Sequence, residues 1–552
     1  MRLTKVELGS ICMESRIKIY RSGELISEST GVDGETLLKH ISEAGIFLDA
    51  PCGGKGRCGK CMVRLSPGGE QVLACRTYID GDMDVYLPDE AEMSVNSEFG
   101  IRNSELSRFT PQVSPSSSNS TLNPSPSALS ETAAHDRLGV AIDIGTTTVV
   151  AHLTDIVTGV RLATASGVNA QRSFGADVIS RIQYCAENGH EKLTQLIHEQ
   201  ISSLIRQTCA AAGKRMQNIT YISIAANTIM EHLAAGYSPV GMGVMPFTPV
   251  SLFGDELPAW DGLPAKKNTK IYYSPAISSY VGGDITAGML AAGLEDDIGP
   301  TVYLDIGTNG EIVLKSGGKY YCCATAAGPV FEGAEITMGM ASVSGAISHV
   351  KWDGGLKLSV IGDNEPYGLC GSGLIDALAV LLETGVVDET GRMLDSEEIE
   401  HELTRHVGKI DGRNVFWLTK KDSGVYVSAI DIRKLQMAKS AIAAGIQTLL
   451  QHSGIAEEKV ASFVIAGGFG SYLDKFSAAR IGLFPESFLP NTITLGNTAG
   501  EGAAMALCYE DAREKLADIR KRCEYVELST SVVFNEQFVE QMTFQKKEAN
   551  HA

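Results

Sequence analysis

The order of hydrophobic and polar residues predicts a small β-rich unit at the start of the chain. Residues 16–20 alternate in polarity as a half-buried strand does, and a glycine turn follows. Residues 35–44 place leucine and isoleucine at helical spacing, and two short apolar runs occupy residues 62–65 and 71–74. We therefore expect one small domain over residues 1–95.

The composition changes abruptly after this unit. The stretch SRFTPQVSPSSSNSTLNPSPSALSETAAHD has too few large apolar residues to offset the entropy lost on ordering. We expect residues 96–136 to form a disordered, flexible linker with a typical span of roughly 35 Å.

From Leu138 onward the pattern is α/β, with apolar strands that run into glycine turns and then helical stretches. An imperfect repeat relates LGVAIDIGTTTVVAHL (138–153) to TVYLDIGTNGEIVLKS (301–316), and each half also has a glycine pair, in SYVGGDITAG (279–288) and VIAGGFGSYLD (464–474). The repeat predicts two similar lobes, residues 137–300 and 301–552, with a ligand cleft between them.

Length and charge narrow the class of protein. At 552 residues the chain suggests three to five folding units, and 44% hydrophobic residues are enough to form several cores. A net charge of −19 opposes binding to nucleic acid. There is no uncharged apolar run long enough for a membrane span and no secretory start, so we expect a soluble cytoplasmic protein with no membrane partner.

Four cysteines form the first candidate site. Cys52, Cys58, Cys61 and Cys75 have the spacing C-x5-C-x2-C-x13-C, and three of them lie on one glycine-rich loop. Zinc sites usually combine two C-x2-C knuckles, whereas this pattern is typical of a [2Fe–2S] cluster, and it is similar to adrenodoxin-type ferredoxins. The alternatives are structural zinc or no metal. In a reducing compartment we expect the other eight cysteines to be small buried hydrophobes rather than disulfides.

The repeated turns form the second candidate site. A strand that ends in Asp-x-Gly-Thr and turns back into a strand presents N–H groups and threonine hydroxyls to an anion, beside a carboxylate suited to Mg²⁺. Asp143 and Asp305 are therefore candidates to hold Mg²⁺ through water, and one of them or Glu311 is a candidate to position the attacking water. A degenerate copy with only a structural role is the alternative.

These turns resemble those of the ATPase superfamily that contains actin, sugar kinases and heat-shock chaperones. The resemblance implies a duplicated actin-like (ASKHA) fold in which both turns grip the nucleotide phosphates and a late glycine pair lies along the adenosine. No Walker A motif competes with this interpretation. The nucleotide-binding residues it implies are Gly145, Thr146, Thr147, Thr148, Gly307, Thr308, Asn309, Gly310, Gly467, Gly468 and Phe469.

The whole chain resembles the reductive activators of corrinoid-dependent enzymes, in the branch with an N-terminal [2Fe–2S] domain. The resemblance rests on the cysteine spacing and on the segments FGADVISRI, AANTIMEHL, DIGTNGEIVL, AAGPVFEGAEITMGM, CGSGLIDALAVLLETGVVD and IAGGFG. It implies an α+β β-grasp ferredoxin domain tethered to the ATPase, and ATP-dependent reduction of a corrinoid protein of a methyltransferase system from Co(II) to Co(I). It also implies a low-potential electron donor, and it allows a homodimer.

Three other functions fit parts of the pattern. An activator of a 2-hydroxyacyl-CoA dehydratase shares the ATPase fold but holds a [4Fe–4S] cluster between subunits. A small-metabolite kinase and a non-catalytic redox carrier are the other two.

Two weaker patterns receive ordinary structural interpretations. Asp177 and Arg181 are four residues apart on an expected helix, which predicts a surface ion pair. His152, His232 and His349 have no partners at ligand spacing and are expected to be structural.

Overall fold

The computed structural model describes residues 14–44, 46, 48, 61–67, 69, 71–88, 137–362, 364–421 and 424–545. The predicted linker of residues 96–136 lies outside them. The chain divides into two compact units, one with the described residues of 1–92 together with 170–188, and one with the described residues of 93–169 and 189–552.

A five-stranded sheet forms the first unit, in the order β2-β1-β5-β3-β4. Its strands are β1 (Glu14–Arg21), β2 (Glu24–Val32), β3 (Met62–Arg64), β4 (Gln71–Leu73) and β5 (Met83–Tyr86). The central strands β1 and β5 are parallel, whereas β1 and β2 and also β3 and β4 pair antiparallel.

Helix α1 (Leu37–Glu43) covers this sheet. Thr36 caps it by accepting a hydrogen bond from the Lys39 N–H. Leu37 and Ile41 are fully buried with Ile17 and Val85 of the sheet. This is the α+β β-grasp arrangement expected from the sequence.

The short segment of residues 170–188 also belongs to the first unit. It contains η2 (Ala170–Ser173) and α4 (Val178–Asn188). The prediction of a surface ion pair is wrong for Arg181, because this side chain is fully buried and donates hydrogen bonds to the Gly175 carbonyl and to Gln171 Oε1. Asp177 instead accepts hydrogen bonds from the N–H and hydroxyl of Ser180.

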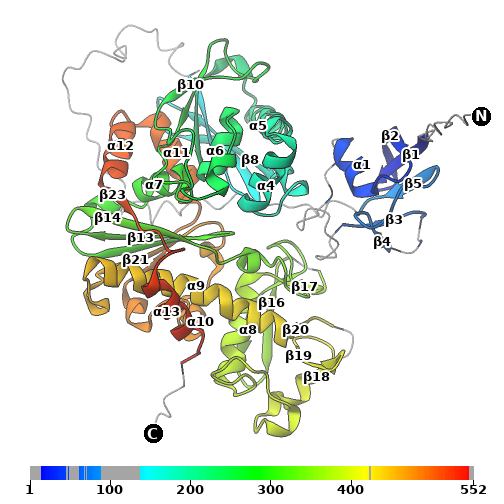
Figure 1. The fold of residues 1–552 in the computed structure, drawn as a ribbon, viewed down its shortest axis with the longest axis vertical. Coiled ribbons are helices and arrows are strands. Elements are labelled where there is room, and N and C mark those ends of the chain that lie inside the picture. Colours follow the sequence, from blue (N-terminus) through cyan, green and yellow to red (C-terminus); the bar gives the residue numbers. More distant parts are fainter. Residues whose placement is uncertain are drawn as a thin grey trace, which may run out of the picture. The chain divides into compact units, whose positions relative to one another are not determined.

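Two six-stranded sheets of the same design form the centre of the second unit (Figure 1). The first has the order β10-β11-β9-β6-β7-β8 and the second β22-β21-β12-β13-β14-β23. Strands β6 and β12 correspond, because each pairs antiparallel with the next strand of the chain and parallel with a later one. The predicted duplication is confirmed.

The strands of the first sheet are β6 (Leu138–Ile144), β7 (Thr148–Asp155), β8 (Arg161–Val168), β9 (Ile219–Ala226), β10 (Glu256–Pro258) and β11 (Lys270–Tyr273). Those of the second are β12 (Thr301–Ile306), β13 (Gly310–Ser316), β14 (Lys319–Thr325), β21 (Ser462–Ala466), β22 (Thr492–Thr494) and β23 (Cys523–Tyr525). The central strands are almost wholly apolar because both faces are covered.

The two glycine pairs do not occupy corresponding positions in the two sheets. Gly467 and Gly468 follow β21, whose counterpart β9 is followed by Asn227. Gly282 and Gly283 instead start α7 (Gly283–Ala291), where a Cβ on Gly282 would lie 2.5 Å from the Ala226 carbonyl oxygen. The first pair therefore permits close packing on the turn after β9 and is no counterpart of the second.

Helix α7 and helix α11 (Thr498–Cys508) lie side by side between the two sheets (Figure 1). Small residues let them approach, since a Cβ on Gly502 would overlap the Ala287 backbone. Helix α11 comes from the second half of the chain but packs on β6 and β9 of the first sheet, whereas α7 comes from the first half and shares a core with the second sheet.

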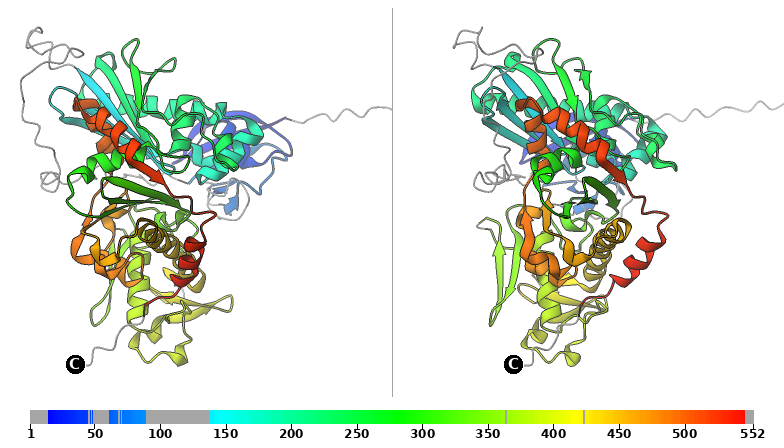
Figure 2. Two further views of the ribbon diagram at one scale, coloured as in Figure 1. Left: turned by 60° about the vertical axis from the view of Figure 1, so that its left-hand side comes forward. Right: turned by 90° about the vertical axis from the view of Figure 1, so that its left-hand side faces the viewer.

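Outer helices and two small sheets complete the second unit. Helix α9 crosses β13 and β14, and α13 lies along α9 (Figure 2). The remaining helices are α5 (Glu191–Ala212), α6 (Thr228–Ala235), α8 (Gly371–Glu383), α9 (Ala429–Ser453), α10 (Lys475–Arg480), α12 (Ala512–Arg522) and α13 (Val532–Glu540). The small sheets contain β15 (Ala346–Trp352), β16 (Leu356–Val360) and β17 (Gly368–Leu369), and β18 (Val407–Ile410), β19 (Arg413–Trp417) and β20 (Tyr426–Ser428).

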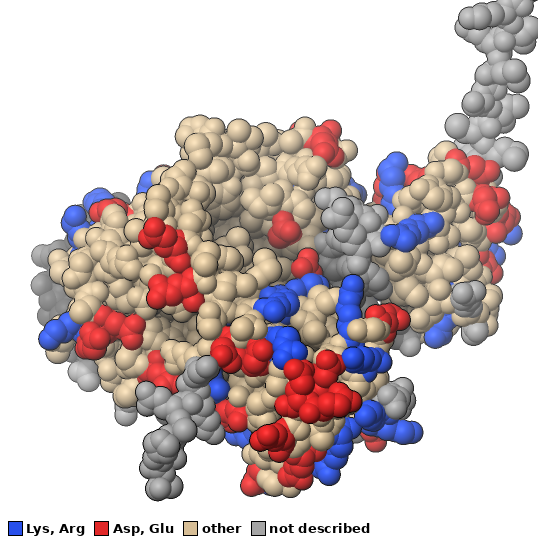
Figure 3. Space-filling view, turned by 60° about the horizontal axis from the view of Figure 1, so that its bottom comes forward, with Lys and Arg blue, Asp and Glu red and all other residues tan. Residues whose placement is uncertain are grey.

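The surface carries the acidic charge that the sequence indicates. Acidic side chains gather in several clusters on the face of the larger unit drawn in Figure 3. None of the helices in the described part of the chain has the length and apolar character that a membrane span requires.

Candidate nucleotide and cluster sites

The two Asp-x-Gly-Thr turns are tight hairpin turns in the structure. The Gly145 N–H donates to the Thr148 carbonyl at 2.9 Å, and the Gly307 N–H donates to the Asn309 carbonyl at 2.9 Å. A Cβ on Gly145 would lie 2.8 Å from the Thr148 carbonyl oxygen, whereas no atom lies within 4 Å of a Cβ on Gly307. The first turn therefore needs glycine for its own closure, and the second is open on its glycine side.

The structure brings these turns together although 161 positions separate their threonines. Thr147 Oγ1 and Thr308 Oγ1 are 3.5 Å apart. The Glu332 carboxylate joins them, because it accepts a hydrogen bond from Thr147 at 2.6 Å and one from Thr308 at 3.0 Å. Thr146 is held separately, as its hydroxyl accepts a hydrogen bond from Asn227 Nδ2 at 3.2 Å.

Four acidic side chains influence one another's charge beside the turns. Asp305 and Glu311 are directly opposite each other on β12 and β13. Burial raises the pKa of Asp143 to about 7, with a further contribution from the charge of Asp305. Burial, and then the charges of Asp305 and Asp143, raise the pKa of Asp284 to about 8. The repeated sequence pattern indicates Asp143, Asp305 and Glu311 but not Asp284, which lies on α7.

The other two carboxyl groups follow the same trend. Burial raises the pKa of Asp305 to about 6, although a hydrogen bond from the Tyr303 hydroxyl opposes this. Burial and the charges of Asp284 and Asp305 raise the pKa of Glu311 well above its ordinary value. Carboxyl groups with raised pKa values are common at functional sites. A cation bound beside these four groups would favour their charged forms.

The late glycine pair lies directly against the second turn. Gly467 has φ +93°, and a Cβ there would lie 2.7 Å from Asp305 Oδ1. Gly468 borders open space, with no atom within 4 Å of a Cβ. The Phe469 ring is partly buried and lies 5.6 Å from the ring of Phe331. Gly307 and Gly468 therefore both border open space beside the carboxyl groups.

Several contacts of the site come from residues that the sequence analysis did not select. Asn497 caps α11 and donates to Asp143 Oδ2 at 2.7 Å. Glu332 lies within the segment AAGPVFEGAEITMGM and Asn227 within AANTIMEHL. Both segments carry the family resemblance, so the sequence did indicate these two regions. Asp284 follows the first glycine pair directly.

Two of the four predicted cluster cysteines are described, and they lie at the same end of one hairpin. Cys61 precedes β3 and Cys75 follows β4, and the Ala74 N–H donates to the Cys61 carbonyl at 2.8 Å. Both are buried and neither is in a disulfide. This placement fits two thiolate ligands of one cluster, while Cys52 and Cys58 lie outside the described residues.

The described part of the chain adds two observations on metal and cysteine chemistry. Within it, no three His, Cys, Asp or Glu side chains converge closely enough to ligate one ion. The cysteines predicted to be small hydrophobes are largely so, because Cys185, Cys209, Cys322, Cys323 and Cys370 are all buried.

The three histidines have structural contacts, as expected. His152 bonds to the Thr164 hydroxyl, and His232 accepts from the Val250 N–H. His349 differs from the expectation in having a charged partner, since its Nδ1 lies 2.9 Å from Oδ2 of the buried Asp376.

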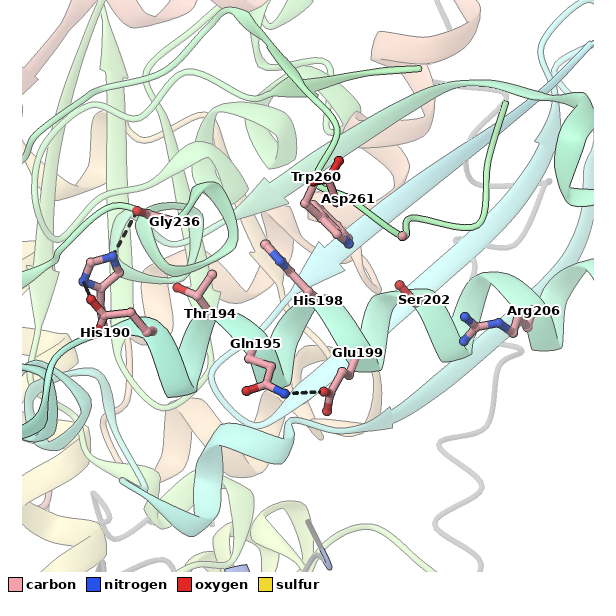
Figure 4. A pocket seen from close by; sticks show the side chains of 12 residues that line it. His190, Thr194, Gln195, His198, Glu199, Ser202, Arg206, Gly236, Trp260 and Asp261 are labelled. Carbon is pink, nitrogen blue, oxygen red and sulfur yellow. Dashed lines mark hydrogen bonds and ion pairs between the residues drawn. The ribbon is translucent and has the colours of Figure 1, made fainter. Parts of the chain in front are cut away.

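A surface pocket of about 620 Å³ lies away from the turns, along α5 (Figure 4). The rings of His198 and Trp260 stack in it with centroids 3.9 Å apart. His198 Nε2 is 2.8 Å from the Ala234 carbonyl, and burial lowers the pKa of this histidine. These contacts hold the loop around Trp260 on α5, so we interpret His198 and Trp260 as structural residues rather than as ligand-binding residues.

Comparison with known families covers most of the chain. Residues 299–552 match a family model described as the C-terminal domain of RACo, the ASKHA domain, and residues 138–297 match the RACo middle region. Residues 25–80 match the 2Fe-2S iron-sulfur cluster binding domain.

Individual proteins give the same result. The corrinoid activation enzyme RamQ of Eubacterium limosum is 31% identical over 93% of this chain and 97% of its own. The [Co(II) methylated amine-specific corrinoid protein] reductase of Methanosarcina barkeri is 23% identical over 74% of this chain and 77% of its own. A solved structure of a reductive activator for corrinoid, iron-sulfur protein is 28% identical, with a TM-score of 0.69 over 97% of this chain and 99% of that chain.

These similarities agree with the β-grasp unit, the duplicated sheets and the paired turns. The chain belongs to the family of reductive activators of corrinoid-dependent enzymes, in which a [2Fe–2S] domain is joined to an ASKHA domain.

Proposed function

We propose that this chain uses ATP to reduce a corrinoid protein of a methyltransferase system from Co(II) to Co(I), with the electron passed through a [2Fe–2S] cluster. The overall reaction converts Co(II) and one electron to Co(I), and ATP and water to ADP and phosphate. The names of the relatives describe corrinoid activation and the reduction of a Co(II) corrinoid protein, and the use of ATP is our addition.

The observation that supports ATP use is the convergence of the two turns. Thr147 and Thr308 lie in the turns that follow the corresponding strands β6 and β12, and their hydroxyl oxygens are 3.5 Å apart. Turn hydroxyls and N–H groups favour a phosphate chain, and the adjacent carboxyls favour its cation. A purely structural pair of turns would not need buried carboxyls with raised pKa values beside it.

The residues of the site receive distinct roles in this proposal. Asp143 and Asp305 hold Mg²⁺ through water, and Gly467, Gly468 and Phe469 border the adenosine. The attacking water is positioned by Glu311 or by one of the aspartates, among which the structure adds Asp284. Phosphoryl transfer depends mainly on positioning and on neutralising charge, and this group of side chains can supply both.

Cys52, Cys58, Cys61 and Cys75 hold the cluster in this proposal. When bound, a plant-type cluster stores one electron at about −400 mV. Formation of Co(I) requires a lower potential, and each 59 mV of mismatch reduces a one-electron equilibrium about tenfold. Coupling to ATP removes this limit if nucleotide occupancy changes how the two lobes bind the corrinoid protein.

The proposal also names partners. The corrinoid protein is the electron acceptor, a separate low-potential protein reduces the cluster, and a homodimer is compatible with both steps. We place the protein in the cytoplasm, where such donors work.

Two single substitutions separate the two halves of the proposed activity. Asp305→Ala should abolish ATP hydrolysis and ATP-dependent Co(I) formation while the visible spectrum of the cluster is kept. Cys75→Ser should lose cluster iron and Co(I) formation while nucleotide binding is kept. Asp353→Ala is the matched control for the aspartate, because this carboxylate is exposed and pairs with Lys357.

The assay follows the Co(I) absorption band after reduced protein, Mg-ATP and a Co(II) corrinoid protein are mixed. Equal Co(I) yields with and without ATP would refute the proposal, and so would wild-type ATP turnover in Asp305→Ala.

A further inference from the structure

Glu332 lies between the two turns to which the proposed function assigns the nucleotide phosphates. Its Oε2 accepts from the Thr147 hydroxyl at 2.6 Å and its Oε1 accepts from the Thr308 hydroxyl at 3.0 Å. One carboxylate therefore takes a hydrogen bond from each of the two turns. A carboxylate and a phosphate are both anions that accept hydrogen bonds from hydroxyl groups.

The loop that carries Glu332 is bordered on both sides by a glycine with a positive φ angle. Glu332 ends the short helix η6 (Pro329–Glu332), which lies between Gly328 at φ +75° and Gly333 at φ +73°. A Cβ on Gly333 would overlap the Met340 backbone, so the chain there is closely packed. We call residues 328–333 the strap.

The strap also contacts Phe469, which the proposed function places beside the adenosine, and it leads to a contact with the long helix α9. Phe331 is buried, and its ring contacts that of Phe469 beside the late glycine pair. Four residues beyond the strap, the N–H and hydroxyl of Thr337 donate to Asp431 Oδ1 in the first turn of α9, at 2.8 and 3.0 Å. A displacement of Glu332 would therefore disturb both the contact of Phe331 with Phe469 and the hydrogen bonds between Thr337 and Asp431.

We propose that Glu332 is an internal substitute for a nucleotide phosphate, which links the two turns when no nucleotide is bound and must leave when one binds. This inference rests on the proposed nucleotide site. A threonine hydroxyl has one proton and donates one hydrogen bond at a time, so the carboxylate and the phosphate compete for it. Two anions on the same pair of hydroxyls would also repel each other.

The consequence is regulatory. Nucleotide binding expels the Glu332 carboxylate and moves the strap, so occupancy of the cleft is transmitted to Phe469 and to the start of α9. The free protein keeps its turns together without ligand, at the expense of nucleotide affinity.

The test is a titration of the full-length, cluster-loaded chain with Mg-ADP by calorimetry. Glu332→Gln keeps the size of the side chain and removes the charge that competes with phosphate. We expect its affinity to rise about tenfold, which corresponds to about 1.4 kcal/mol. We also expect the melting temperature without nucleotide to fall, because the link between Thr147 and Thr308 weakens.

Glu335→Gln is the matched control, since it removes the same charge three residues further along the chain. Glu335 is exposed, and its backbone carbonyl, not its side chain, is the group that contacts Lys434. We expect both its affinity for Mg-ADP and its melting temperature to remain those of the wild type.

The outcomes separate this inference from the proposed function. Equal affinity in the wild type and Glu332→Gln, or weaker affinity in Glu332→Gln, refutes the competition while the nucleotide site stands. Unchanged affinity with slower ATP turnover would make Glu332 a residue that positions water, which also refutes it. If neither protein binds Mg-ADP, the proposed function and this inference fail together.

Discussion

Gly467 lies directly against Asp305, and its replacement by alanine tests how closely the second turn is packed. At φ +93° an L residue costs about 1–2 kcal/mol more than glycine. The new Cβ would also lie 2.7 Å from both Asp305 Oδ1 and the Ile306 carbonyl oxygen, and crowding of this kind costs about 1–3 kcal/mol. Gly467→Ala should therefore lower the unfolding free energy of the second unit, which contains the two six-stranded sheets, by about 2–5 kcal/mol.

Tryptophan fluorescence can follow this unit alone. The chain has three tryptophans, and all of them lie in the second unit: Trp260, Trp352 and Trp417. At about 2.1 cal/mol/K of unfolding entropy per residue, a unit of about 400 residues shifts by about 1 °C per kcal/mol, so the midpoint of thermal unfolding should fall by about 2–6 °C. Nucleotide affinity should fall as well, because Asp305 must move to make room.

Gly468→Ala is the matched control. No atom lies within 4 Å of its Cβ, and its φ is outside the left-handed region. Its midpoint should correspond to a change within about 0.5 kcal/mol of the wild type. If Gly467→Ala melts at the same temperature as Gly468→Ala, the argument from backbone conformation and crowding is wrong. A loss of nucleotide affinity in Gly468→Ala with an unchanged midpoint would indicate that ligand occupies the open space there.

Two further substitutions test single contacts. Asn497→Ala removes both the cap of α11 and the hydrogen bond to Asp143, and should destabilise the chain by about 2–4 kcal/mol in urea unfolding. Asn497→Ser keeps a capping hydroxyl and loses only the hydrogen bond to Asp143, so it should cost less; equal losses would show that the cap contributes nothing. The hydrogen bond to Asp376, and then its charge, raise the pKa of His349, so this histidine stabilises the fold fully below pH about 6.5 and loses its effect as pH rises through the raised pKa. The stability difference between wild type and His349→Gln should therefore be larger at pH 6 than at pH 8, and a difference independent of pH would contradict this.

The sequence predicted those parts of the molecule that depend on neighbouring residues. Each Asp-x-Gly-Thr turn is encoded within a few positions, and in the first turn local backbone closure also requires the glycine, Gly145. Repetition of the turn then revealed the duplication. The hairpin that places Cys61 near Cys75 was predictable for the same reason.

Contacts between distant segments could not be predicted from local pattern. The bond from Thr147 to Glu332 spans 185 positions and that from Asn497 to Asp143 spans 354. Similarly, helical spacing placed Arg181 on a surface, but its burial depends on the loop that folds over it and supplies the Gly175 carbonyl. The partner of His349 was missed because Asp376 lies on a different element.

The exchange of α7 and α11 between the two sheets has a consequence for synthesis of the chain on the ribosome. All six strands of the first sheet have been made once Tyr273 is added, but the helix that covers β6 and β9 is residues 498–508. The emerging first half therefore exposes an apolar face until residues 498–508 have been made. A fragment that stops near residue 300 would keep that face uncovered permanently, so we expect such a fragment to aggregate or to require a chaperone.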